Sequence, residues 1–120
     1  MNWFRQKQPG LEKFHVRNMT FLGEQDGPIE REFKRRLLDC FATSTTLHKA
    51  YLVRARYDDS TKVNVVLALD ANPGGQVVLR DRAYKVFREM FSSEVWLDVL
   101  FPNEEQEQRI SVVAKPFYQR

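Results

Sequence analysis

The stretch that most constrains the fold of this chain is residues 48–70, HKAYLVRARYDDSTKVNVVLALD. Apolar side chains alternate with other side chains in two runs, which is the pattern of half-buried strands. A polar turn, Asp58-Asp59-Ser60-Thr61, joins the two runs and is longer than a two-residue hairpin loop. Patterns typical of amphipathic helices lie on both sides of this pair. We therefore expect a sheet that packs against helices.

Two helices are predicted from apolar residues at helical spacing. Asp26-Gly27-Pro28 is a typical helix start, and the residues after it repeat on one helical face: Ile29, Phe33, Leu37, Cys40 and Phe41. The break at Asn72-Pro73-Gly74-Gly75 precedes the second such face, which consists of Ala83, Val86, Phe87, Met90 and Phe91. Further strand patterns at residues 13–22 and 94–101 complete the order strand, helix, strand, strand, helix, strand.

That order predicts the α+β class and a ferredoxin-like β-α-β-β-α-β sandwich, in which both helices cover one face of a four-stranded antiparallel sheet. Each strand–helix–strand connection is expected to be right-handed. From Asn103 onward we expect a short helix, whose continuation Pro116 blocks. An edge strand at residues 110–114 is the alternative for this tail.

The chain has 120 residues, which is long enough for one domain with a buried core. We expect a flexible arm at residues 1–12 and a single domain at residues 13–120. Cys40 lies on a predicted helix stripe and is expected to be a plain core thiol. The first residues lack the apolar segment of a signal peptide, and no apolar run reaches the roughly 18 residues of a membrane span. The expected location is therefore the cytoplasm, with no membrane partner.

Residue types that carry catalysis do not converge in this sequence. His15 and His48 belong to different strand regions, and neither has further ligands at metal-binding spacing. The Asp58-Asp59 pair fits a solvated turn better than an acid–base pair. We predict no catalytic residue, no metal and no cofactor.

Nucleic-acid binding is not expected either. The net charge of +3 is far from the dense basic patch of a dedicated nucleic-acid binder. The strand at residues 63–70 presents no aromatic ring on which a base could stack. The basic residues of the second helix, Arg80, Arg82, Lys85 and Arg88, are interleaved with Asp81 and Glu89, which is typical of a solvated surface.

The two faces of the predicted sheet differ in composition. One face is almost wholly apolar and is expected to lie under the helices: Tyr51, Val53, Val65, Leu67, Leu97 and Val99. The other is expected to be open, and we predict that it binds a partner through Leu52, Arg54, Arg56, Val66, Trp96, Asp98 and Leu100. An apolar centre, a tryptophan and arginines are typical of interfaces. Alternatively, the chain's own tail covers this face with Ile110, Val112, Val113, Phe117 and Tyr118.

These patterns resemble the C-terminal domain of the enhanced serine sensitivity protein B (SseB) family. The resemblance covers about residues 13–120 and rests on four features: Gly23 with Pro28, Ala50-Tyr51-Leu52, the strand at residues 65–69, and Pro116-Phe117-Tyr118. It implies a bacterial, cytoplasmic, non-enzymatic domain, and the family name implies a link to serine tolerance. Family members often carry a separate N-terminal domain, which the arm at residues 1–12 cannot replace. The resemblance transfers no catalytic residues.

Two hypotheses of function follow from these observations. The favoured one is a non-enzymatic protein-interaction or regulatory module that binds a protein partner, or a second copy of itself, through the open face of its sheet. The alternative is a small-ligand sensor of the ACT kind, in which ferredoxin-like domains bind amino acids at a subunit interface. This alternative rests on the predicted fold and on the family's association with serine.

Overall fold

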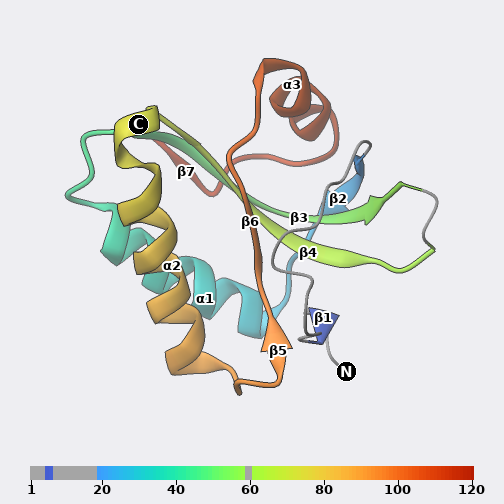
Figure 1. Ribbon diagram of the computed structural model, residues 1–120, viewed down its shortest axis with the longest axis horizontal. Helices are drawn as coiled ribbons and strands as arrows, with labels where there is room; N and C mark the ends of the chain where they lie inside the picture. Colours follow the sequence, from blue (N-terminus) through green and yellow to red (C-terminus); the bar gives the residue numbers. More distant parts are fainter. Residues whose placement is uncertain (1–4, 7–18, 59–60) are drawn as a thin grey trace.

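A computed structural model describes residues 5–6, 19–58 and 61–120 (Figure 1). It is an α+β structure with a mixed sheet. The helices are α1 (Pro28–Phe41), α2 (Gln76–Met90) and α3 (Glu104–Val113), and a short 3-10 turn, η2 (Pro73–Gly75), leads into α2. The strands are β1 (Arg5–Gln6), β2 (Met19–Glu24), β3 (Leu47–Tyr57), β4 (Asn64–Ala71), β5 (Val95–Trp96), β6 (Asp98–Leu100) and β7 (Tyr118–Gln119). The rest of the predicted arm, and residues 13–18 of the first predicted strand, lie outside the described residues.

The strands of the main sheet run in the order β2-β3-β4-β6, and β7 pairs with β3 beside β2. β2, β4 and β7 are antiparallel to β3, whereas β6 is parallel to β4. The expectation of a wholly antiparallel sheet is therefore wrong, and the ferredoxin-like order is not confirmed. In particular, α1 connects two neighbouring antiparallel strands, β2 and β3. A helical connection is compatible with either strand direction, so the sequence pattern did not distinguish them.

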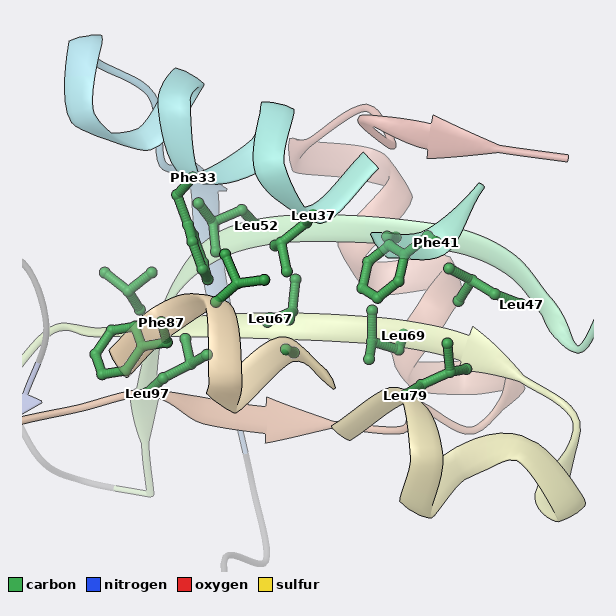
Figure 2. Packing of buried hydrophobic residues seen from close by; sticks show 14 residues of the cluster. Phe33, Leu37, Phe41, Leu47, Leu52, Leu67, Leu69, Leu79, Phe87 and Leu97 are labelled. Atoms are coloured by element: carbon green, nitrogen blue, oxygen red, sulfur yellow. The ribbon is translucent and has the colours of Figure 1, made fainter. Parts of the chain in front are cut away.

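Helices α1 and α2 cover one face of the sheet, and Figure 2 shows their apolar side chains pointing at the strands. Both predicted helices are present, and their stripes supply buried residues such as Phe33, Leu37 and Phe87. The rings of Phe33 and Phe87 meet edge to face, with centroids 6.0 Å apart. Cys40 is half-buried and packs against this cluster. Ile29 was expected on the buried stripe but is 54% exposed, because it lies in the first turn of α1, at the margin of the contact.

Helix α3 covers the opposite face. Its Ile110, together with Ala114 directly after the helix, packs among buried residues of the strands: Met19, Phe21, Tyr51, Val53, Ala55, Val66 and Ala68. A capping box starts the helix, because the Asn103 side chain accepts from the Gln106 backbone N–H at 2.8 Å and the Gln106 side chain accepts from the Asn103 N–H at 2.9 Å. The expected tail helix is thus confirmed, and the alternative strand at residues 110–114 is wrong. In the described part of the chain, each face of the sheet thus packs against at least one helix.

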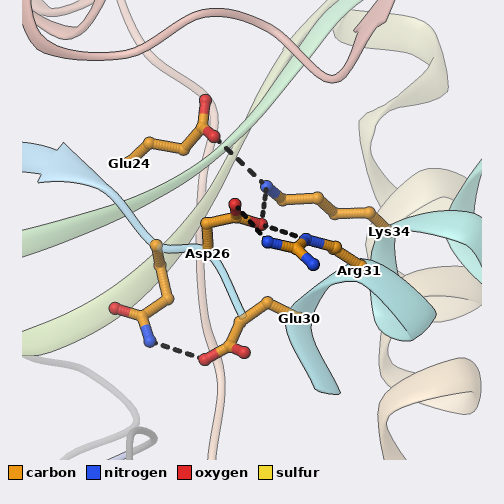
Figure 3. A network of polar contacts seen from close by, with 6 residues as sticks. Glu24, Asp26, Glu30, Arg31 and Lys34 are labelled. Atoms are coloured by element: carbon orange, nitrogen blue, oxygen red, sulfur yellow. Dashed lines mark hydrogen bonds and ion pairs between the residues drawn. The ribbon is translucent and has the colours of Figure 1, made fainter. Parts of the chain in front are cut away.

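Polar contacts attach the start of α1 to the end of β2 (Figure 3). The Lys34 ammonium lies 3.6 Å from the Glu24 carboxylate and 3.7 Å from that of Asp26. Arg31 donates to both oxygens of Asp26 at 3.3 Å, and this hydrogen bonding holds the pKa of the Asp26 carboxyl below its ordinary value. Beneath them, the Gln25 amide donates to buried Glu30 at 2.7 Å. The exposed pairs contribute little stability, so their main effect is to fix the turn that aims α1 across the sheet.

Candidate binding site

The seven residues predicted to bind a partner do not form one surface. Leu52 is buried beneath α1 and α2, whereas Val66 is buried on the face that α3 covers. Asp98 is also buried, and its carboxylate accepts from the Tyr57 hydroxyl at 2.5 Å. Leu100 is half-buried and packs against the cluster under α3. The prediction of an open face is therefore wrong, because its apolar residues belong to two different cores.

The register of the central hairpin explains this error. Leu52 pairs with Leu67 and Val53 pairs with Val66, so even-numbered residues of β3 share a face with odd-numbered residues of β4. The prediction had put odd-numbered residues of both strands together. A shift of one residue exchanges the two faces of a strand. Tyr51 and Val53 consequently lie under α3 instead of α1 and α2, while Val65, Leu67 and Leu97 lie under α1 and α2 as predicted, and Val99 packs against that cluster.

The remaining three residues are accessible to different extents. Arg54 is exposed, Arg56 is half-buried, and both extend from the part of β3 that pairs with β2. Trp96 is half-buried in β5, which pairs with Arg5–Gln6 of β1. Of the seven, only Trp96 is among the described residues that line the pocket considered next.

A pocket of about 500 Å³ lies between α2 and the segment at residues 92–97, and we call it the α2–β5 pocket. Helix α2 contributes the side chains of Arg80, Tyr84 and Arg88, which recur at steps of four residues along one side of the helix. The two arginines are eight residues apart, which corresponds to about 12 Å along the helix axis. The pocket is therefore lined by two cationic side chains at different positions along α2.

The chain turns back along α2 because the helix ends at Met90 and Phe91 takes an extended conformation. Ser92 then accepts from the Glu94 and Val95 backbone N–H groups, each at 3.3 Å, through its side chain and its carbonyl respectively. This turn brings Trp96 and Leu97 to the same pocket as the arginines, and Phe87 of α2 lines it as well. The lining therefore combines basic, aromatic and apolar side chains.

The electrostatics of the α2–β5 pocket favour an anion. The Arg88 guanidinium lies 5.8 Å from the centre of the Tyr84 ring, and among the described residues it has no ion pair. Arg80 lies 3.5 Å from Asp81, but both side chains are largely exposed and water screens the pair. The site therefore suits a group that combines a negative charge with an apolar or planar part.

The pocket has no obvious catalytic arrangement within the described part of the chain. Ser92 and Ser93 line it, but no histidine does, and His48 is hydrogen-bonded to Asn72 at 2.9 Å. Among the described residues, no group of three or more His, Cys, Asp or Glu side chains is placed to hold a metal ion. Across the same residues, no helix has the length and apolar character needed to cross a membrane.

A second polar cluster lies under α3. The Tyr51 hydroxyl donates to the Glu107 carboxylate at 3.2 Å, and the Lys49 ammonium lies 3.9 Å from the same oxygen. Burial and the neighbouring Asp70 carboxylate raise the pKa of Glu107 above its ordinary value. Burial, together with Glu107, raises the pKa of Tyr51 to about 12. These groups are held between the sheet and α3, so they bear on how α3 docks.

Sequence reasoning selected Trp96 but missed Arg80, Tyr84 and Arg88. It assigned the two arginines to a solvated surface because acidic residues are interleaved with them. The signal that could have found them is their spacing of four residues directly beside the apolar stripe of the same helix.

Comparison with protein-family models, with curated proteins and with solved structures gave no match. The resemblance to the SseB family therefore stays a prediction, which rests on the residues quoted for it.

Proposed function

We propose that this chain is a non-enzymatic protein-interaction or regulatory module, and that it binds its partner in the α2–β5 pocket. The observation that carries the proposal is the pairing of Arg80 and Arg88 with an aromatic hollow that includes Trp96. Tryptophan, tyrosine and arginine dominate the binding energy of protein interfaces, and they do so in pockets. The proposal keeps Trp96 as the anchor and moves the binding surface from the sheet face to the helix side.

The chemistry of the pocket specifies the partner's segment. The guanidinium group of an arginine can bind a carboxylate with two parallel hydrogen bonds. The aromatic rings that line the pocket offer a surface to an apolar side chain. With roughly 12 Å between the two arginine positions, a short segment with spaced carboxylates can reach both. We therefore propose an acidic segment that carries at least one apolar residue. The resemblance to SseB, with its implied cytoplasmic and non-enzymatic role, supports the same class of function.

A small-ligand sensor of the ACT kind is the second candidate, and the volume of the pocket favours it. About 500 Å³ falls within the range of small-molecule sites. An arginine could hold the carboxylate of an amino acid, and Asp81 could accept from its ammonium group. The parallel β4–β6 pair departs from the expected ferredoxin-like order of ACT domains, which makes this the weaker candidate.

The proposal can be tested with the fluorescence of Trp96. The chain has two tryptophans, so Trp3→Phe leaves Trp96 as the single reporter. Titration with a short synthetic peptide rich in Glu and Leu should change its emission. In the Arg80→Ala/Arg88→Ala variant, we expect the affinity to fall about tenfold or more, because two charge-assisted contacts are lost.

Arg54→Ala is the matched control, since Arg54 is exposed and belongs to the surface first predicted from the sequence. It should leave the titration unchanged. Identical titrations for the original chain and the double variant would contradict the proposal. Free amino acids form a second arm: a rise in melting temperature with one of them, abolished by the same double variant, would favour the sensor.

A further inference from the structure

Helix α3 has an outward side that its own fold leaves exposed. Glu107, Ile110 and Ala114 face the sheet, so the opposite side of the helix points to solvent. That side carries Glu104, Glu105, Gln108 and Val112. Val112 is 84% exposed, the highest value among the exposed large apolar residues. An acidic start followed by an apolar residue is the kind of segment that the α2–β5 pocket suits.

The charges on this side of α3 are available to a partner. Glu104 is exposed and has no ion pair within the described residues, and Glu105 has a single weak one, 3.8 Å from Arg109. Helix α3 carries three glutamates, Glu104, Glu105 and Glu107, against one arginine. Helix α2 has the opposite character, because Arg80, Arg82, Lys85 and Arg88 outnumber Asp81 and Glu89.

The outward side of α3 carries its carboxylates and its apolar residue at different positions along the helix. Arg80 and Arg88 are eight residues apart on α2, and Glu104 and Val112 are eight residues apart on α3. Each pair spans about 12 Å. The adjacent carboxylates of Glu104 and Glu105 can therefore meet one arginine, while Val112, about 12 Å further along the helix, offers an apolar side chain to the rings that line the pocket.

The two surfaces cannot meet within one molecule. Helix α2 packs on one face of the sheet and α3 packs on the other, as Figure 1 also shows. The complementary surfaces therefore lie on opposite sides of the sheet, and a second copy is needed to bring them together.

We infer that the segment bound by the α2–β5 pocket is the outward side of α3 from a second copy of this chain. The inference rests on the proposed function, since it names the partner of the same pocket. The contact is heterologous: one copy offers its α2 side and the next copy its α3 side. Such contacts generate open chains of molecules, or rings where the rotation closes.

Exchange of the charges tests this inference in sedimentation velocity at low salt. The first variant, Arg80→Glu/Arg88→Glu, has two acidic surfaces, and the second, Glu104→Lys/Glu105→Lys, has two basic ones. Each variant alone should self-associate at least about tenfold more weakly than the original chain, because like charges then meet. An equimolar mixture should assemble again, since every contact in it joins opposite charges. Added salt, at about 0.5 M, should dissociate both the mixture and the original chain.

Two controls make the result specific. Arg35→Glu/Arg54→Glu changes the net charge by the same amount at exposed positions outside both surfaces and should assemble like the original chain. Val112→Ser should weaken self-association without lowering the melting temperature, because Val112 is 84% exposed and the change adds no charge. Circular dichroism establishes that each variant is folded, and Val112→Ser keeps the test independent of the lysine variant.

The outcomes separate this inference from the proposed function. A chain that remains monomeric at low salt, up to about 1 mM, overturns the inference. So does a charge-exchanged mixture that fails to assemble although both variants are folded. If the peptide rich in Glu and Leu still binds at Trp96 in either case, the proposed function stands and its partner is another protein. If that peptide fails to bind, the proposed function falls.

Discussion

At the scale of single residues, Glu107 belongs to the polar cluster between the sheet and α3. It lies between Tyr51 and Lys49 of β3, next to Asp70 of β4. Its raised pKa means that this carboxyl binds its proton more tightly in the folded chain than in the unfolded chain. In the unfolded chain its pKa is near 4.5. The contribution of Glu107 to the free energy of unfolding therefore decreases as the pH rises past that value.

Replacing Glu107 with glutamine should stabilise the chain at neutral pH. The amide oxygen of glutamine can still accept from the Tyr51 hydroxyl, and its NH₂ group can donate to Asp70, so no charge has to be desolvated. We expect the Glu107→Gln variant to gain about 0.5–1 kcal/mol of unfolding free energy at pH 7, and to lose this advantage near pH 4. Urea unfolding at the two pH values measures both.

Glu105→Gln removes the same charge from the exposed side of α3 and serves as the control. It should show no comparable gain. A Glu107→Gln variant that is less stable than the original chain at pH 7 would show that the carboxylate is favourably paired, contrary to the raised pKa.

At the scale of single elements, α1 presents a buried side and an exposed side in adjacent residues. Leu37 is fully buried, whereas its neighbour Leu38 is 37% exposed. We expect Leu37→Ala to reduce the free energy of unfolding by about 2–5 kcal/mol, because it leaves a cavity among α1, α2 and the sheet. Leu38→Ala should change it by less than about 1 kcal/mol. Denaturant midpoints of the two variants give the comparison, and equal losses would mean that α1 is not docked as described.

The elements themselves could largely be predicted from the sequence. The stripe from Phe33 to Phe41 and the alternation in residues 48–70 are both spaced like the structure that they form, so local periodicity was sufficient. The order and direction of the strands could not be predicted in this way. They depend on which strands meet: β6 joins β4 in parallel, and β7 takes a place on β3 that no local pattern signals.

The candidate site was less predictable for a related reason. Trp96 was identified by its residue type alone, which is informative wherever it lies. The pocket around it requires the turn at Ser92 that brings β5 back along α2, and this arrangement leaves no periodic trace in the sequence. Arg80 and Arg88 become candidate binding residues only because that arrangement places them at the pocket.

At the scale of the whole molecule, α3 is the cover of one face of the sheet. Ile110 is its fully buried contact, and Val112, two residues later, is its most exposed apolar side chain. Ile110→Asp should reduce the free energy of unfolding by about 3 kcal/mol or more, because it buries a charge without a partner. Val112→Asp should change it by less than about 1 kcal/mol. Thermal unfolding of both variants gives the comparison. An Ile110→Asp variant as stable as the original chain would mean that the packing of α3 does not contribute to the stability of the domain.

Neighbouring residues of β3 belong to different hydrophobic clusters: Tyr51 lies in the cluster under α3, and Leu52 lies in the cluster under α1 and α2. The backbone of the sheet stands between them as a partition. A gap opened in one cluster cannot be refilled by side chains from the other, so defects on opposite sides should combine additively. Each cluster can therefore accept substitutions and repack without changes in the other, so the domain behaves as two independent cores on either side of one sheet.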